Sequence, residues 1–435
     1  MKNIRYVLVV SLAFIFSNVT SYAATQKINF QEKDPVEQYN IALRYYSGDG
    51  VRQNFVYAAE WFKKSANQGY APAQYELAGL YASGAGNFRQ SDKYAFPLYK
   101  KAAEQDHPKA QYFLAEMYQN GRATKKDEAK AFELYEKSAV NGFCDAQKVM
   151  GDYYYNGGFV DQDYEKAYGW YMKAKEQGDA KAAYCLGNMY RDGQYVQKNM
   201  LKAVEFYKFA AEKDYTPAEC ELGSYYFDQD NLKAAFDWYE KAANKGYSQA
   251  EYYLGLIYYY GYGGYQNYTY ALEYFRRAYV GGSEEAGFML GQMYYEGEAV
   301  EENYKEALEY FKEAAQQANL PQAQYMTGMM YLNGEGTNID REEAKVWLQK
   351  AADQGHENAI QKVKYLSGND LSQRAGINIV KSTQTETTVD LHSAINSKNS
   401  EATKSVKQST STAKADKNEK SKTSTKNVLN SRTGE

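Results

Sequence analysis

The sequence predicts an all-α fold, a solenoid of about nine helix-turn-helix repeats of about 36 residues each. Two series of small residues, in register along the chain, are the main evidence. In the first series, a tyrosine lies three residues after a glycine or alanine: Ala42, Ala78, Ala115, Gly151, Gly187, Gly223, Gly255, Gly291 and Gly328. The second series is an alanine that recurs every 32 to 37 residues: Ala58, Ala95, Ala131, Ala167, Ala203, Ala235, Ala271, Ala307 and Ala344.

The first series marks the first helix of each repeat. Leu186 and Tyr190 lie four residues apart around Gly187, which places both side chains on one helical face. A glycine follows the small residue by six positions in eight of nine copies, and Gln229 is the exception. Prolines fall at five predicted helix starts, where a missing amide hydrogen loses no partner: Pro35, Pro72, Pro108, Pro217 and Pro321.

The second series marks the second helix of each repeat. Three and four residues after the alanine comes a large pair, such as Trp170 and Tyr171, and we expect it to fill the space beside the small residues. Pro97 lies inside one of these helices, so we expect a kink or a late start there. Glycines are expected to stop six of them: Gly69, Gly142, Gly178, Gly246, Gly282 and Gly355.

These motifs resemble the Sel-one-like repeat, a relative of the tetratricopeptide repeat. The segments AAYCLGNMYRDG (182–193) and KAAFDWYEKAANKG (233–246) carry the pattern most clearly, and the resemblance covers about residues 35 to 366. It implies a right-handed α/α superhelix that binds other proteins as an adaptor or scaffold. Members of this family are often secreted or periplasmic in host-associated bacteria.

The two ends of the chain differ from the repeats. Lys2 and Arg5 precede an apolar run, and Ser21 and Ala23 form a small-x-small site, so residues 1–23 are predicted to be a signal peptide cleaved after Ala23. An uncleaved anchor is the alternative. The mature chain has no other apolar stretch of membrane length, so we expect a periplasmic or secreted protein.

The predicted organisation of the mature chain has four parts. A short lead (24–34) precedes nine repeats (35–355), and a capping helix (356–368) covers the last apolar face. Residues 369–435 are rich in Ser, Thr and Lys and are predicted to be a disordered tail. The tail carries a net charge of +4 and residues 24–368 carry −10, so the array lacks the basic footprint of a nucleic-acid binder.

No combination of residues predicts an enzyme, a cofactor or a metal site. Cys144, Cys185 and Cys220 lie in different repeats without C-x-x-C spacing. We expect buried thiols, with an inter-repeat disulfide between Cys185 and Cys220 as the alternative. The three histidines are His107 and His356, at turns between repeats, and His392 in the tail.

Two short matches to known motifs have simpler explanations. The S-x-x-K match from Ser411 to Lys414 lies in the Ser- and Lys-rich tail and lacks the partner motifs of penicillin-recognising enzymes. The segment from Asp161 to Glu165 lacks the glycine and final glutamate of a calcium loop. It is interpreted as a turn that enters a helix.

The remaining candidate for function is a stripe on the first helices, formed by the residues three before, one after and four after the small residue. In tetratricopeptide-like solenoids this stripe lines the concave groove. The candidate partner-binding residues are the aromatics four after it, with Tyr260 beside them: Tyr46, Tyr155, Phe227, Tyr259, Tyr260 and Tyr295. The alternative is that these rings pack on the neighbouring repeat as core. The groove is favoured only from Phe227 to Tyr295.

Two classes of function follow. The first is a non-catalytic scaffold that is exported and binds a protein or peptide in its groove, in host interaction or in envelope complexes. The second is a cell-envelope module that binds glycan, such as peptidoglycan, or regulates a cell-wall enzyme, because aromatic grooves also suit sugar rings.

Overall fold

The computed structural model describes residues 31–366, in which the regular secondary structure is helical and no strand occurs. Nineteen α-helices form nine pairs and one additional final helix. The first helices are α2 (Pro35–Ser47), α4 (Ala71–Ser83), α6 (Pro108–Asn120), α8 (Cys144–Asn156), α10 (Ala180–Asp192), α12 (Thr216–Asp228), α14 (Ser248–Tyr260), α16 (Glu284–Glu296) and α18 (Pro321–Asn333). The second helices are α3 (Phe55–Asn67), α5 (Asp92–Ala103), α7 (Glu128–Val140), α9 (Tyr164–Glu176), α11 (Met200–Ala211), α13 (Leu232–Ala243), α15 (Tyr268–Val280), α17 (Tyr304–Gln317) and α19 (Arg341–Asp353). This arrangement confirms the predicted nine helix-turn-helix repeats.

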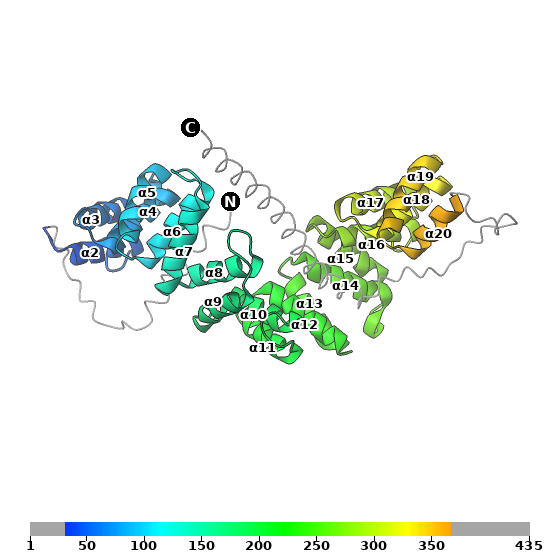
Figure 1. Cartoon of the computed structure of the whole chain (residues 1–435), viewed down its shortest axis with the longest axis horizontal. Coiled ribbons are helices and arrows are strands. Elements are labelled where there is room, and N and C mark those ends of the chain that lie inside the picture. The colour runs from blue at the N-terminus through cyan, green and yellow to red at the C-terminus, as the bar shows by residue number, and fades with distance from the viewer. Residues whose placement is uncertain (1–30, 367–435) are drawn as a thin grey trace, which may run out of the picture. The chain divides into compact units, whose positions relative to one another are not determined.

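The described residues fall into two compact units, and the division lies inside the fourth repeat. Unit 1 consists of residues 31–155 with Phe159–Asp161, and unit 2 consists of Asn156–Gly158 with residues 162–366. Within unit 1, helices α2 to α7 pack as successive antiparallel pairs, and α10 to α19 do the same within unit 2 (Figure 1). Each unit is therefore a stack of repeats with its own core.

In each repeat, one large side chain of the second helix packs against the small residue of the first helix; it is called here the closing side chain. A methyl group added to Gly187 would lie 2.5 Å from the Tyr207 ring, and one added to Gly255 would lie 2.5 Å from the Phe275 ring. The closing side chain comes four residues after the series alanine and is buried in every repeat: Phe62, Tyr99, Tyr135, Tyr171, Tyr207, Tyr239, Phe275, Phe311 and Leu348. The predicted role of the small residues in helix approach is confirmed.

The helix ends follow the sequence signals. Pro35, Pro72, Pro108, Pro217 and Pro321 all occupy the first two positions of their helices. Most second helices begin after an Asp or Asn whose side chain accepts backbone N–H groups. Asp163, for example, accepts from the Lys166 amide at 3.0 Å, which confirms that residues 161–165 are a turn entering a helix. The six glycines predicted to stop second helices all have left-handed φ angles between 76° and 91°.

Buried polar side chains join successive repeats at the position four residues before the small residue. Gln111 is buried and donates from its side-chain amide to the Ala103 carbonyl of the preceding second helix, at 3.4 Å. In another repeat the position holds buried Glu251, which pairs with Arg277 at 2.7 Å. The Arg277 guanidinium then donates to the Ala243 carbonyl at 3.0 Å. In both cases, a carbonyl group at the end of the preceding second helix accepts a hydrogen bond from a side chain.

Two further expectations concern particular segments. Pro97 lies within α5, which begins three residues before Ala95 just as α3 begins three residues before Ala58, so a late start is wrong. A final helix, α20 (Glu357–Leu366), packs against α19 as expected of a cap. The predicted signal peptide and the predicted tail lie outside the described residues. None of the helices in residues 31–366 is long and apolar enough to cross a membrane.

Replacement of Gly255 by alanine should lower the free energy of unfolding by about 1–3 kcal/mol, because the new methyl group would clash with the Phe275 ring. Gly169 is the matched control. It lies inside α9 with no atom within 4 Å of an added methyl group, so Gly169→Ala should raise the free energy of unfolding by about 0.5–1 kcal/mol. Urea unfolding of both variants measures these effects. Changes of the same sign would contradict the contact.

Candidate functional site

The stripe on the first helices, called here the first-helix face, consists of the residues three before, one after and four after each small residue. The structure corrects the groove prediction at two of its aromatic positions. Phe227 is only 3% exposed and Tyr259 only 7%, so both rings belong to the core. The rings of Tyr46, Tyr155, Tyr260 and Tyr295 are half-buried, and their predicted role in partner binding stays a prediction.

The aromatics four after the small residue contact the loop that follows the first helix of the next repeat. The Tyr295 hydroxyl donates to the Glu335 carboxylate at 3.1 Å. Tyr259 is close to Glu298 in the corresponding loop, and burial together with this carboxylate raises the pKa of Tyr259. These rings therefore hold neighbouring repeats together, as the alternative interpretation stated, because burial of an aromatic contributes to packing while its hydroxyl keeps a partner.

The position three before the small residue forms a second contact between repeats, which sequence reasoning missed. Tyr75 stacks on His107 at a ring distance of 4.9 Å, and Tyr325 stacks on His356 at 4.7 Å. Tyr112 and Phe143 meet edge to face at 5.2 Å. The sequence signal was the recurrence of aromatic or histidine residues just before the first helices, where Ser, Asp or Asn is usual.

Both histidines at these turns are helix caps. The Nδ1 atom of His107 accepts from the Ala110 amide at 3.2 Å, and that of His356 accepts from the Ala359 amide at 3.2 Å. Only a neutral imidazole can accept in this way. Burial, with help from Lys109, lowers the pKa of His107 to about 4, and burial lowers the pKa of His356. Their role is structural.

Tyrosines of the second helices bring hydroxyl groups to the first-helix face. The buried Tyr207 donates to the Asn188 side chain at 2.8 Å, and the buried Tyr239 donates to the Ser224 hydroxyl at 3.1 Å. Asn188 and Ser224 each come directly after a small residue. Where the closing ring is Phe275, which has no hydroxyl, the residue after the glycine is the apolar Leu256 instead. In some repeats the face therefore combines aromatic rings with polar groups, and in others it is apolar at this position.

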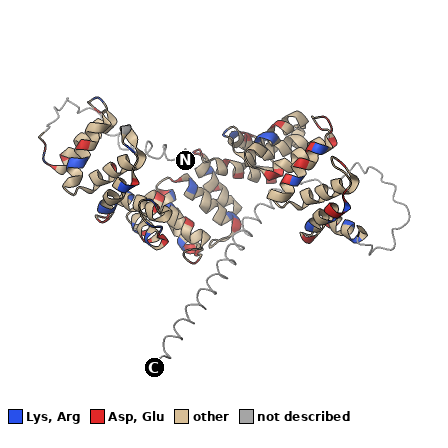
Figure 2. Ribbon diagram, turned by 90° about the horizontal axis from the view of Figure 1, so that it is seen from above, with Lys and Arg blue, Asp and Glu red and all other residues tan. Residues whose placement is uncertain are grey.

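Carboxylates occupy a further register of the first helices, two residues before the small residue. Glu221 accepts from the Arg191 guanidinium of the preceding repeat at 3.2 Å, and Arg191 also pairs with Asp192 at 2.9 Å. Glu76 occupies the same register in the second repeat. Elsewhere, basic and acidic residues are interspersed along the helices of each unit (Figure 2).

Within residues 31–366, the structure does not bring together the side chains that were candidates for catalysis or metal binding. Cys144, Cys185 and Cys220 form no disulfide in the structure, so the alternative of a bridge between Cys185 and Cys220 does not hold, although only Cys220 is fully buried. Within residues 31–366, no group of three or more His, Cys, Asp or Glu side chains is placed to hold a metal ion. His392 and the segment Ser411–Lys414 lie outside the described residues.

Comparison with known proteins places the repeats in a family. The model of the Sel1 repeat matches residues 38–70, 71–107, 108–143, 144–179, 180–215, 216–247, 248–282, 285–319 and 321–356. A solved Sel1 repeat protein from Oxalobacter formigenes is similar, with 24% identity and a TM-score of 0.54 over 82% of this chain and 99% of that chain. No curated protein matches the chain.

Two other solved structures are similar over most of this chain. A protective antigen present in uropathogenic Escherichia coli strains, which displays an SLR fold, has 26% identity and a TM-score of 0.42 over 78% of this chain and 89% of that chain. A signal-transduction ATPase from Pyrococcus horikoshii with a tetratricopeptide repeat sensor has 17% identity and a TM-score of 0.45 over 78% of this chain and 56% of that chain.

Replacement of Tyr259 by alanine should lower the free energy of unfolding by about 3–5 kcal/mol, because it removes a buried ring. Tyr270 in the same repeat is 51% exposed, and Tyr270→Ala should change the free energy by less than about 1 kcal/mol. Chemical unfolding of the two variants compares them directly. Equal losses would mean that Tyr259 is not part of the core.

The histidine caps should make stability depend on pH. Below pH 6.5 the unfolded chain takes up a proton at His107 that the folded chain does not, so the free energy of unfolding should fall as the pH decreases from 6.5 towards 4. The double variant His107→Asn, His356→Asn keeps a capping acceptor that does not titrate. Its pH profile over this range should be flatter than that of the native chain; superimposable profiles would contradict the role.

Proposed function

Because this chain belongs to the Sel1 repeat family, whose members generally mediate protein–protein interactions, we propose that it is a non-catalytic scaffold exported from the bacterial cytoplasm. It binds a protein or peptide partner along the first-helix face. The binding is non-covalent, and the scaffold holds its partner for an assembly at the cell envelope or in contact with a host.

The observation that carries this proposal is the composition of the first-helix face. Its residues three before the small residue are half-buried tyrosines in four repeats: Tyr39, Tyr112, Tyr184 and Tyr325. A half-buried tyrosine is held rigidly by its neighbours and still presents ring edge and hydroxyl to a partner. Such side chains provide contact area with little loss of conformational entropy, which is why tyrosine is enriched in binding energy hot spots.

Export is supported by the sequence before the repeats. Residues 1–23 carry a basic start, an apolar run and a small-x-small site, and such a segment directs a chain through the inner membrane. The proposed place of action is therefore the periplasm or the medium, with a mature chain that starts at Ala24.

A cross-linked pull-down tests the scaffold proposal. The full chain, with a tag after Glu435, is produced in its own host and recovered from the periplasm and the medium, where mass spectrometry should find Ala24 as the first residue. Partners are captured by the native chain and by the variant Leu43→Glu, Met329→Glu. These two side chains are half-buried, lie one residue after the small residue, and place one charge on the face of each unit. We expect a specific protein to be captured by the native chain and lost with the variant.

The control places the same two charges elsewhere. Leu201 and Val280 lie on second helices and are 69% and 87% exposed, so Leu201→Glu, Val280→Glu should still capture the partner. Capture that survives the first pair and fails with the second would move the binding surface to the second helices. Retention of murein fragments alone, with no protein, would overturn the scaffold in favour of the glycan-binding alternative. A chain that stays in the cytoplasm would contradict export.

A further inference from the structure

Glu76 is an acidic side chain on the face between the first two repeats of unit 1. It lies on α4, two residues before Ala78, and it is half-buried. Its carboxylate acts electrostatically on the hydroxyl groups of Tyr39 and Tyr46 in the first repeat and of Tyr75 in its own repeat. The carboxylate is therefore within electrostatic range of the hydroxyl groups of two tyrosines of α2.

The same register in unit 2 shows what such a carboxylate binds. Glu221 lies two residues before Gly223 and accepts a hydrogen bond from the Arg191 guanidinium at 3.2 Å. Arg191 comes four residues after Gly187 in the preceding repeat, and Tyr184 comes three residues before it. An arginine of one repeat thus pairs with a glutamate of the next repeat, and a tyrosine precedes that arginine by seven residues.

In the first two repeats the carboxylate and the tyrosine are present but the cation is not. Tyr39 corresponds to Tyr184 and Glu76 to Glu221, whereas Tyr46 stands where Arg191 would be. Among the residues that the structure describes, Glu76 forms no ion pair and no hydrogen bond. Lys109 lowers the pKa of Glu76 from a distance without forming an ion pair with it. A partly buried carboxylate without a paired charge is costly to the fold, so a role in binding would account for it.

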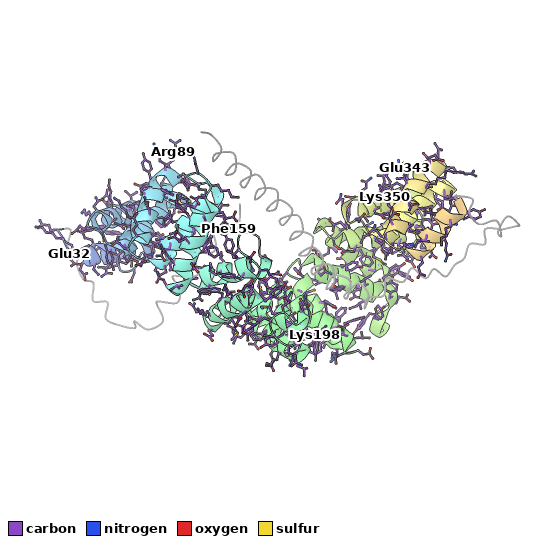
Figure 3. The ribbon with its side chains drawn as sticks, in the orientation of Figure 1. Glu32, Arg89, Phe159, Lys198, Glu343 and Lys350 are labelled. Carbon is purple, nitrogen blue, oxygen red and sulfur yellow. The ribbon has the colours of Figure 1, made fainter. Side chains whose placement is uncertain are left out.

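The chain supplies its own cations to other aromatic side chains. Lys64 lies over the Trp61 ring at 3.9 Å, and Lys350 lies over the Trp347 ring at 4.0 Å. Lys350 and Glu343 both come from α19 (Figure 3), and the Glu343 carboxylate accepts from the Trp347 indole at 2.9 Å. Tryptophan, carboxylate and lysine together form a satisfied set there. The set around Glu76 has the rings and the carboxylate but lacks the cation.

We propose that Glu76, Tyr39 and Tyr46 form a binding site for one arginine or lysine side chain of the protein partner. The inference rests on the proposed scaffold function and names the chemistry of one recognition element. The carboxylate pairs with the incoming cation, and the tyrosine rings bind it through their faces and replace part of its hydration. The charge of the repeat array, −10 over residues 24–368, favours the approach of a basic segment.

Binding at this site should depend on pH. Burial raises the pKa of Glu76 to about 7. The other titratable groups around it keep their charge near neutrality: the pKa values of Tyr39, Tyr75 and Tyr99 are raised by burial, that of Tyr46 is raised as well, and that of His107 is lowered to about 4. Lys109 remains the neighbouring cation. A cationic ligand should therefore bind more tightly at pH 8 than at pH 5.5, where Glu76 is protonated and neutral.

The test is an NMR titration of the full mature chain labelled at its glutamate side chains, with the Glu76 signal assigned from Glu76→Gln. The probe is a capped pentapeptide with one arginine among glycine and serine residues. Its matched control carries citrulline, which has the shape of arginine without the charge. We expect the arginine peptide to lower the pKa of Glu76 to below about 6 and the citrulline peptide to leave it unchanged. Glu76→Gln should weaken arginine-peptide binding at least about tenfold.

Two further variants sharpen the test. Glu104 is an exposed acid at the end of α5, off the first-helix face, and it pairs with Lys100 at 3.9 Å, so Glu104→Gln should leave the binding of the arginine peptide within about twofold of the native value. Tyr46→Arg reproduces the pair of Arg191 and Glu221 inside the chain. It should fill the site and abolish binding of the peptide.

Several results would overturn the proposal. Equal binding of the arginine and citrulline peptides, or unchanged binding by Glu76→Gln, would mean that charge recognition at Glu76 is absent. A Glu76 pKa that is already near 4 to 5 in the chain alone would mean that the carboxylate is not perturbed and needs no cation, which would remove the basis of the proposal. If the pull-down captures a partner equally well with Glu76→Gln, the scaffold stands and only the cation site fails. If no partner is captured while the titration succeeds, the scaffold proposal fails instead.

Discussion

The contact between the small residue of each first helix and the large closing side chain of its second helix determines the geometry of every repeat. Gly187 and Gly255 leave room for the rings of Tyr207 and Phe275, and a single methyl group would not fit. Because protein interiors are close-packed, this contact sets how closely the two helices approach. The identity of the ring also decides whether a hydroxyl group reaches the first helix. The Tyr207 hydroxyl donates to Asn188, and a phenylalanine has no hydroxyl to donate.

The junctions between repeats explain the tyrosine content of this chain, which has 47 tyrosines and 18 phenylalanines. At a junction the ring must cover apolar surface, and its far end reaches a polar loop or a helix start. Tyr295 does both, because its ring packs near Phe311 of its own repeat and its hydroxyl reaches Glu335 of the next repeat. Phenylalanine would leave Glu335 without this partner, so tyrosine suits these positions better.

The candidate surface was only partly predictable from helical periodicity. Periodicity gives the direction in which a side chain leaves its own helix, and on that basis Phe227 and Tyr259 were expected to line the groove. It says nothing of what the next repeat places over that face. The Phe227 ring meets Tyr262 at 5.3 Å, and Tyr259 is covered by its own repeat and the next one, so both rings are core. The partial burial of the tyrosines three before the small residue, such as Tyr39 and Tyr184, could be determined only from the packing of the repeats.

The sequence by itself determined the number of repeats, their boundaries, the packing of small residues against large ones and the glycine helix stops, because each of these follows from interactions within about 36 residues. The tertiary structure decided which side chains are buried and which charges are paired. Glu76 and Glu221 hold the same place in their repeats, yet Arg191 of the preceding repeat pairs with Glu221, and no cation within residues 31–366 forms an ion pair with Glu76. Such differences arise between repeats, from side chains that lie far apart in sequence and meet only when the helices stack.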